Sequence, residues 1–169
     1  MNFPILSSLI LLPSIGAFFL FFTKSKKEDN KTVKYVALFT SLVTFFLSIY
    51  LWILFDQSTS EFQFIEDRVW IEGLINYKVG IDGISILFII LTTFITPLCI
   101  ISVNNSIQKR LSEFLIAILI MESFMIGVFC SLDLVVFYLF FEAGLIPMFL
   151  IIGIWGGSRR VYSAFKFFL

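Results

Sequence analysis

The sequence predicts an all-α membrane protein with five transmembrane helices and the start of a sixth. Of its 169 residues, 59% are hydrophobic and 14% are charged, whereas soluble domains average roughly 45 to 50% apolar and about 25% charged residues. The apolar residues form runs close to the roughly 20 residues that a helix needs to cross a bilayer. Five such runs leave too few residues for a catalytic domain in water, so the chain is expected to act in the membrane or at its surface.

Residues 1–55 form the first predicted region, two transmembrane helices joined by a lysine-rich link on the inner side. The run at residues 2–22 has no positive charge before it, whereas a secretory signal peptide carries positive charges ahead of its apolar core. This run is therefore predicted to be a retained helix. The second helix is predicted at residues 32–55, and residues 56–80 are predicted to be an outer interfacial loop with room for a short helix on the membrane surface.

Residues 81–169 form the third predicted region, the start of a helix bundle. Its helices are predicted at residues 81–103, 111–131 and 132–155, with a sixth beginning near residue 161. Asp82 and Asp133 stand at helix starts, where aspartate caps free backbone N–H groups. The last run gives roughly 13 Å of helix, less than the roughly 30 Å of a hydrocarbon core. We therefore expect the chain to be the N-terminal piece of a longer unit.

The lysines and arginines predict the orientation of the helices. The links after the first, third and fifth helices carry nine of them, whereas the even-numbered links carry only Arg68 and Lys78. Positively charged short links stay on the cytoplasmic or matrix side of a membrane. The N-terminus is therefore predicted to lie on the outer side.

The composition excludes several classes of function. The formal net charge is zero, whereas a nucleic-acid-binding protein needs a basic face. The chain contains no histidine, the most common ligand of haem, copper and zinc sites. Cys99 and Cys130 lie near the ends of separate runs and on opposite predicted faces, too far apart for a disulfide. Any proton chemistry therefore falls to carboxylates and lysines.

Two glutamates lie in the middle of predicted spans. Glu122 stands ten residues before Leu132 and Glu142 ten residues after it, so in an antiparallel helix pair they would share one depth. An acidic residue at that depth costs roughly 2.5 to 3.5 kcal/mol and usually marks an ion or proton route. The count leaves open whether the two share a face, in which case they would titrate as a coupled pair. It also leaves open that each only joins helices through a hydrogen bond in its neutral form.

Glu142 is the first candidate for proton transfer, Glu122 the second and Lys166 a third. Pro147 cannot donate a hydrogen bond to the carbonyl of Ala143, so the fifth helix is expected to bend beside Glu142. For Lys166 the ordinary role is to extend its amine back to the inner surface.

Several segments resemble one family, the subunit-4 proteins of the proton-pumping NADH:ubiquinone oxidoreductase, respiratory complex I. They are VGIDGIS at residues 79–85, GVFCSLDL at 127–134, FFEAGLIPM at 140–148, GIWGG at 153–157 and RVYSAFKFF at 160–168. The resemblance is strong from residue 79 onward, and the first two helices agree with the family in hydropathy and placement.

The resemblance implies an antiporter-like bundle of about fourteen helices in the complete subunit. It implies that Glu142 corresponds to the glutamate of the fifth helix that pairs with a lysine on a later helix, beyond Leu169. Lys166 matches a different lysine, early in the sixth helix. The resemblance also places NADH, FMN, the iron–sulfur clusters and ubiquinone in partner subunits and no cofactor in this chain. The implied partners are other membrane-arm subunits, and lipids are expected around the spans. The short last helix leaves two alternatives for the rest of the subunit, a second chain, which we expect, or a continuation of this one.

The predicted function is therefore proton translocation coupled to electron transfer from NADH to ubiquinone, with no redox chemistry in this chain itself. The abundance of Phe, Ile, Leu and Lys suggests an AT-rich genome, as in an organelle or a reduced bacterium. We expect the mitochondrial inner membrane, with a bacterial plasma membrane as the alternative. Two alternatives stay open, a cation/proton antiporter subunit and a purely structural membrane anchor. Copurification with a flavin and iron–sulfur assembly would distinguish the predicted function from the antiporter. Carboxylate replacements that leave transport intact would favour the structural anchor.

Overall fold

The computed structural model describes residues 4–23, 30–71, 75–103, 107 and 110–169. Its elements in chain order are α1 (Ile5–Thr23), α2 (Asn30–Leu54), β1 (Gln63–Ile71), β2 (Ile75–Ile81), α3 (Ser85–Ser102), α4 (Leu111–Cys130), α5 (Leu134–Trp155) and α6 (Arg160–Phe168). Helices α1 to α5 are each long and apolar enough to cross a membrane. The predicted all-α membrane class with five spans is therefore confirmed, with helix ends within a few residues of those expected.

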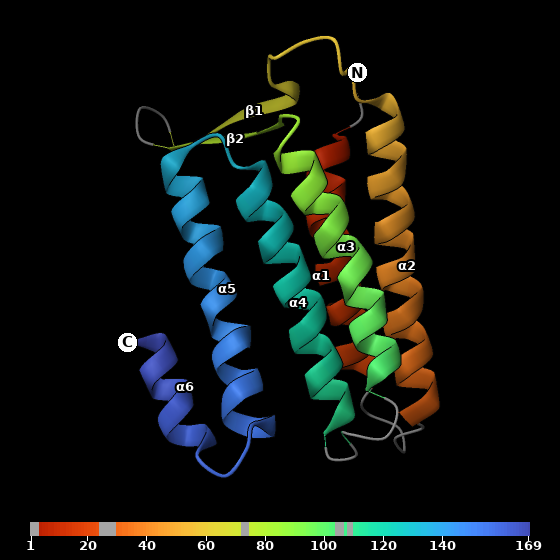
Figure 1. Cartoon of the computed structure of the whole chain (residues 1–169), viewed down its shortest axis with the longest axis vertical. Coiled ribbons are helices and arrows are strands. Elements are labelled where there is room, and N and C mark those ends of the chain that lie inside the picture. The colour runs from red at the N-terminus through yellow and green to blue at the C-terminus, as the bar shows by residue number, and fades with distance from the viewer. Residues whose placement is uncertain (1–3, 24–29, 72–74, 104–106, 108–109) are drawn as a thin grey trace.

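The five long helices lie side by side, and successive helices run in opposite directions (Figure 1). α4 lies at the centre, where it contacts α1, α2, α3 and α5. In α4, 56% of the span is buried inside the protein, against 11% in α5. α6 turns back beside α5 and packs against it. One side of α5 is thus the most open apolar surface among the spans.

The region predicted as an interfacial loop is a β-hairpin at one end of the bundle, the end at which α1 begins (Figure 1). β1 and β2 pair antiparallel, with Asp67 opposite Lys78 and Arg68 opposite Tyr77. The expected surface helix is wrong. Apolar residues alternate with Asn76, Lys78 and Gly80 in β2, and five of the nine residues of β1 are β-branched or aromatic, and both features suit a pleated strand. The hairpin also holds the turn between α4 and α5, since the Leu132 amide donates to the Lys78 carbonyl at 2.9 Å.

Both predicted caps are confirmed. The Asp133 carboxylate accepts hydrogen bonds from the amides of Val135 and Val136 at the start of α5. The Asp82 carboxylate accepts one from the Ser85 amide at 2.7 Å at the start of α3. The hydrogen bonds from Ser85 lower the pKa of Asp82 below its usual value, so this cap stays charged near neutral pH.

The core consists of two hydrophobic clusters with a polar layer between them. One cluster lies near the hairpin and includes Leu6, Leu51, Ile89 and Ile126. The other lies toward the opposite end and includes Leu20, Ala37, Ile100, Leu115 and Leu119. Apart from Ser112 near the start of α4, the buried polar residues of the described chain fall between the two sets along α2, α3 and α4; they are Ser41, Thr44, Ser48, Thr93, Thr96, Glu122 and Ser123. We call these seven residues the polar layer.

Candidate functional site

Glu142 is half-buried on α5 and points away from α4. A β-carbon added to Gly127 of α4 would touch Phe140 of α5, and one added to Gly144 of α5 would touch Phe124 of α4. Phe140 and Gly144 therefore face α4. Glu142 lies two residues from each, or about 200° around the helix at about 100° per residue. The carboxyl group therefore sits on the open side of α5.

The nearest described polar partner of Glu142 is on its own helix. The Tyr138 hydroxyl lies within hydrogen-bonding reach of the Glu142 carboxyl one turn along α5, and Tyr138 is 58% exposed. Farther along α5, Phe149 packs edge-to-face against Phe165 and Phe168 of α6. This side of α5 therefore combines an acid, a phenol and a seam of aromatic rings.

Lys166 does not meet either glutamate. It is exposed on α6, and the ion pairs found in the described part of the chain do not include one between Lys166 and an acidic side chain. This placement agrees with the ordinary role of an inner-surface lysine.

Glu122 has the opposite environment from Glu142. Its side chain is 1% exposed, and it approaches Thr96 of α3. Among the described residues neither carboxyl oxygen has a partner with hydrogen-bond geometry. Glu122 thus faces α3 while Glu142 faces away from α4, so the two glutamates do not share a face.

The hydroxyls of the polar layer were not identified from the sequence. Ser41, Thr44 and Ser48 follow one another at intervals of three and four residues along α2, which places them on one helix face. That face contacts α3, because the Ser48 and Thr93 hydroxyls lie 2.8 Å apart. The spacing was a usable signal for a buried polar face beside Glu122.

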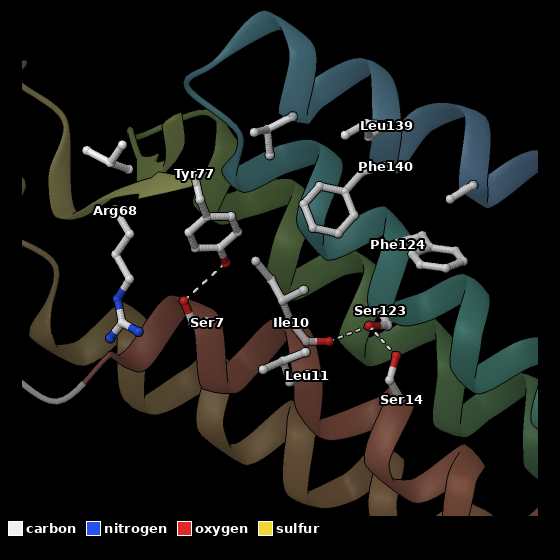
Figure 2. A pocket seen from close by; sticks show the side chains of 13 residues that line it. Ser7, Ile10, Leu11, Ser14, Arg68, Tyr77, Ser123, Phe124, Leu139 and Phe140 are labelled. Atoms are coloured by element: carbon white, nitrogen blue, oxygen red, sulfur yellow. Dashed lines mark hydrogen bonds between the residues drawn. The ribbon is translucent and has the colours of Figure 1, made fainter. Parts of the chain in front are cut away.

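A groove of about 740 Å³ lies between α1, α4 and α5 beneath the hairpin. Figure 2 shows its walls, with Leu139 and Phe140 from α5, Phe124 from α4 and Ile10 and Leu11 from α1. Polar groups lie at two levels of the groove. Ser7, Arg68 and Tyr77 lie near the hairpin, and Ser14 donates to Ser123 at 2.8 Å deeper in the bundle. Sequence reasoning missed this groove, which depends on long-range packing.

The hairpin is fastened to α1 through Glu66. Its carboxylate accepts hydrogen bonds from the Leu6 amide at 2.9 Å and from the Ser7 amide at 3.3 Å, and a further one from the Ser7 hydroxyl. The Ser7 hydroxyl also lies 3.1 Å from the Tyr77 hydroxyl, and burial raises the pKa of Tyr77 above its usual value. Because the first amides of a helix lack partners within the helix, Glu66 supplies an N-terminal acceptor from 60 residues away.

Replacing Glu66 by alanine is expected to loosen the hairpin from α1. Loss of a comparable helix-cap acceptor costs about 1 kcal/mol. We expect a lower temperature of unfolding and faster protease cleavage within the hairpin, measured on the purified assembly. Asp67→Ala is the matched control, because Asp67 makes only an exposed contact of 3.9 Å with Lys78. Equal effects of the two changes would contradict this role of Glu66.

No group of three or more His, Cys, Asp or Glu side chains suited to a metal ion occurs among the residues that the structure describes. Both cysteines are unpaired, with Cys99 exposed and Cys130 buried. Glu122 and Glu142 are the acidic residues near the middle of the described spans.

Comparison with known proteins gives a consistent result. A family model described as NADH:quinone oxidoreductase/Mrp antiporter, TM, matches residues 131–169. The chain is 59% identical over 140 residues, 83% of its length, to NADH-quinone oxidoreductase subunit M of Rhodobacter capsulatus, and covers 27% of that protein. It is 47% identical over its full length to subunit M of Rickettsia conorii, covering 35% of it. It is 46% identical over 97% of its length to NADH-ubiquinone oxidoreductase chain 4 of Marchantia polymorpha, covering 33% of it.

The chain therefore spans about a third of the length of these relatives. The segment matched by the family model contains α5 and α6, and with them Glu142 and Lys166. Glu122 lies outside that segment. The two glutamates thus differ in environment and also in their relation to the matched segment.

Proposed function

Because the chain belongs to the family of NADH-quinone oxidoreductase subunit M and NADH-ubiquinone oxidoreductase chain 4, we propose that it forms part of the membrane arm of a proton-translocating NADH:ubiquinone oxidoreductase. The relatives named above are subunits of an enzyme complex. In this proposal the chain contributes to proton translocation, while NADH, FMN, the iron–sulfur clusters and ubiquinone bind to partner subunits.

The observation that carries the proposal is the position of Glu142. It lies in the middle of a membrane span, within the segment that the family model matches. An acid at that depth is costly unless it meets water, charge or a polar partner. Its exposed neighbour Tyr138 and the low burial of α5 support a further protein surface on this side of the helix.

We propose that the remainder of the subunit packs against α5 and α6 and provides a lysine that pairs with Glu142. Opening and closing of this ion pair would change the proton affinity of the carboxyl group, because a nearby positive charge favours its ionised form. A carboxyl group whose affinity alternates in this way can take up a proton from one side and release it to the other. Quinone reduction in partner subunits would drive the alternation.

The location proposed is an energy-converting membrane with the N-terminus on the outer side. The five spans establish a membrane location, and the lysines and arginines of the odd-numbered links support the orientation. Relatives from plants and from bacteria make the mitochondrial inner membrane and the bacterial plasma membrane the two candidates. We favour the former on composition, with lipids against the exposed apolar faces of α1, α2 and α3.

A cation/proton antiporter subunit is the second candidate, since the matched family model includes Mrp antiporters. Purification through an affinity tag on this chain distinguishes the oxidoreductase subunit from the antiporter subunit. Membranes are solubilised in mild detergent, and the tagged assembly is assayed for FMN, iron–sulfur signals and NADH:ubiquinone activity. The proposed function predicts all three in the same fraction. A tagged assembly that catalyses cation/proton exchange without flavin would establish the antiporter instead.

A further inference from the structure

The polar layer contains a buried acid whose surroundings offer almost no hydrogen-bond donors. Glu122 is 1% exposed, and both of its carboxyl oxygens lack partners among the described residues. Buried polar atoms in folded proteins almost always have a partner, either protein or ordered water. The unsatisfied pair of oxygens therefore points to an occupant other than the described residues.

The hydroxyls of the polar layer already donate their protons to backbone carbonyls. Thr96 donates to the Thr92 carbonyl at 3.0 Å, and Thr93 donates to the Ile90 carbonyl at 3.1 Å. The other hydroxyl groups of this layer also donate to backbone carbonyls: Ser41, Thr44 and Ser48 to those of Leu38, Thr40 and Phe45 on α2, and Ser123 to that of Ile10 on α1. Because a hydroxyl group has one proton and two lone pairs, these oxygens present mainly acceptors to their surroundings.

An ionised carboxylate does not fit a site lined by acceptors. Four lone-pair positions on Glu122 would face the lone pairs of the hydroxyls, and the negative charge would be buried without a counter-charge. Burying an unpaired charge costs far more than burying a neutral polar group. The site therefore requires donors, and the first of these is a proton on the carboxyl group itself.

One proton leaves the site incomplete. A neutral carboxyl group donates one hydrogen bond, which the lone pairs of Thr96 can accept, but its carbonyl oxygen still needs a donor. A water molecule has two donors and two acceptors, and it commonly fills such positions in protein interiors. It can donate to Glu122 and to a hydroxyl of the polar layer at the same time.

We propose that Glu122 is a neutral carboxylic acid that binds a buried water molecule in the polar layer between α3 and α4. This site lies on a different side of the bundle from Glu142 and does not depend on the role proposed for Glu142. Its ligand is water, held by one acid and by hydroxyl lone pairs.

The first test is a density map of the assembled wild-type complex at a resolution that shows ordered water. We expect a peak at about 2.7 to 3.2 Å from a Glu122 carboxyl oxygen and within the same range of a hydroxyl of the polar layer. A peak with several protein oxygens closer than about 2.6 Å would identify a bound cation and overturn the proposal. A map with ordered water elsewhere in the bundle but none beside Glu122 would also overturn it.

The second test is infrared difference spectroscopy of the wild-type complex against Glu122→Gln. We expect the variant to lose one C=O stretching band of a protonated carboxyl group, whereas loss of carboxylate bands alone would overturn the proposal. Thr96→Val should shift this C=O band by removing an acceptor. Thr92→Val is the matched control, because Thr92 is half-buried on the same helix, outside the polar layer, and donates to the Phe88 carbonyl, and it should leave the band in place.

These measurements do not depend on proton pumping. If Glu142→Gln retains full pumping, the proposed function fails while the water site beside Glu122 stands. If the water molecule and the C=O band of the protonated carboxyl group are both missing in a fully pumping complex, the proposed water site is wrong while the proposed function stands. Should Thr96→Val fail to assemble, the wild-type map and the Glu122→Gln spectrum still decide the question.

Discussion

Replacing Glu142 by glutamine is expected to abolish proton pumping in the assembled complex. Glutamine keeps the size and polarity of the side chain but cannot gain and lose a proton. Positioned acid–base groups commonly accelerate proton transfer by about 100-fold or more, so pumping should fall at least that far. Glu142→Asp should retain part of the activity, because the carboxyl group remains and is displaced by only one methylene.

The measurement uses purified complex in sealed vesicles, with a pH-sensitive dye that reports acidification during NADH oxidation. Oxidation of NADH by an artificial acceptor checks that the complex has assembled. Glu113→Gln is the matched control, since Glu113 makes an exposed contact of 3.7 Å with Arg110 at the start of α4, and it should pump normally. Normal pumping by the Glu142→Gln complex would remove this residue from the mechanism.

A leucine at position 127 is expected to separate α4 from α5 and to reduce the amount of assembled complex. A β-carbon built on Gly127 would lie 2.7 to 2.8 Å from ring carbons of Phe140, closer than van der Waals contact allows. Overpacking of this kind typically costs about 1 to 3 kcal/mol. The yield of complex and its temperature of unfolding should both fall.

Gly83→Ala is the control for this change, because no atom lies within 4 Å of a β-carbon at Gly83, and it should assemble normally. Combining Gly127→Leu with Phe140→Ala should restore part of the lost assembly by removing the clashing ring. Unchanged yield in Gly127→Leu would mean that α4 and α5 do not meet as described.

These two changes together separate a pump from a structural anchor. A proton-transferring chain predicts an assembled but inactive complex for Glu142→Gln and a poorly assembled one for Gly127→Leu. A purely structural chain predicts that only Gly127→Leu has an effect. The comparison is informative because Glu142 lies on the side of α5 away from α4, whereas Gly127 lies in the α4–α5 interface.

The spans and their caps were predictable from the sequence because they depend on local properties. Run length and hydropathy fix a membrane helix in any context, and Asp133 caps α5 through amides two and three residues away. The hairpin was predicted less well. Its strands mix charged and apolar residues, and the expectation of a surface helix gave too little weight to the alternation that favours strands.

The relation between the two glutamates was only half predictable. Because each glutamate lies ten residues from Leu132, the two lie at similar positions along α4 and α5. The face on which each lies depends on the rotation of one helix relative to the other. That rotation is set by the contact of Gly127 with Phe140, which residue counting does not reveal. The link from Glu66 to Leu6 and the groove beside it were beyond reach for the same reason, since both join segments far apart in the chain.

The surroundings of Glu142 in the assembled complex test the central claim most directly. A density map that includes the whole subunit should show a lysine nitrogen within about 4 Å of the Glu142 carboxyl group or ordered water leading away from it. A Glu142 side chain packed only against lipid acyl chains, with neither water nor a charged neighbour, would contradict its role in proton transfer.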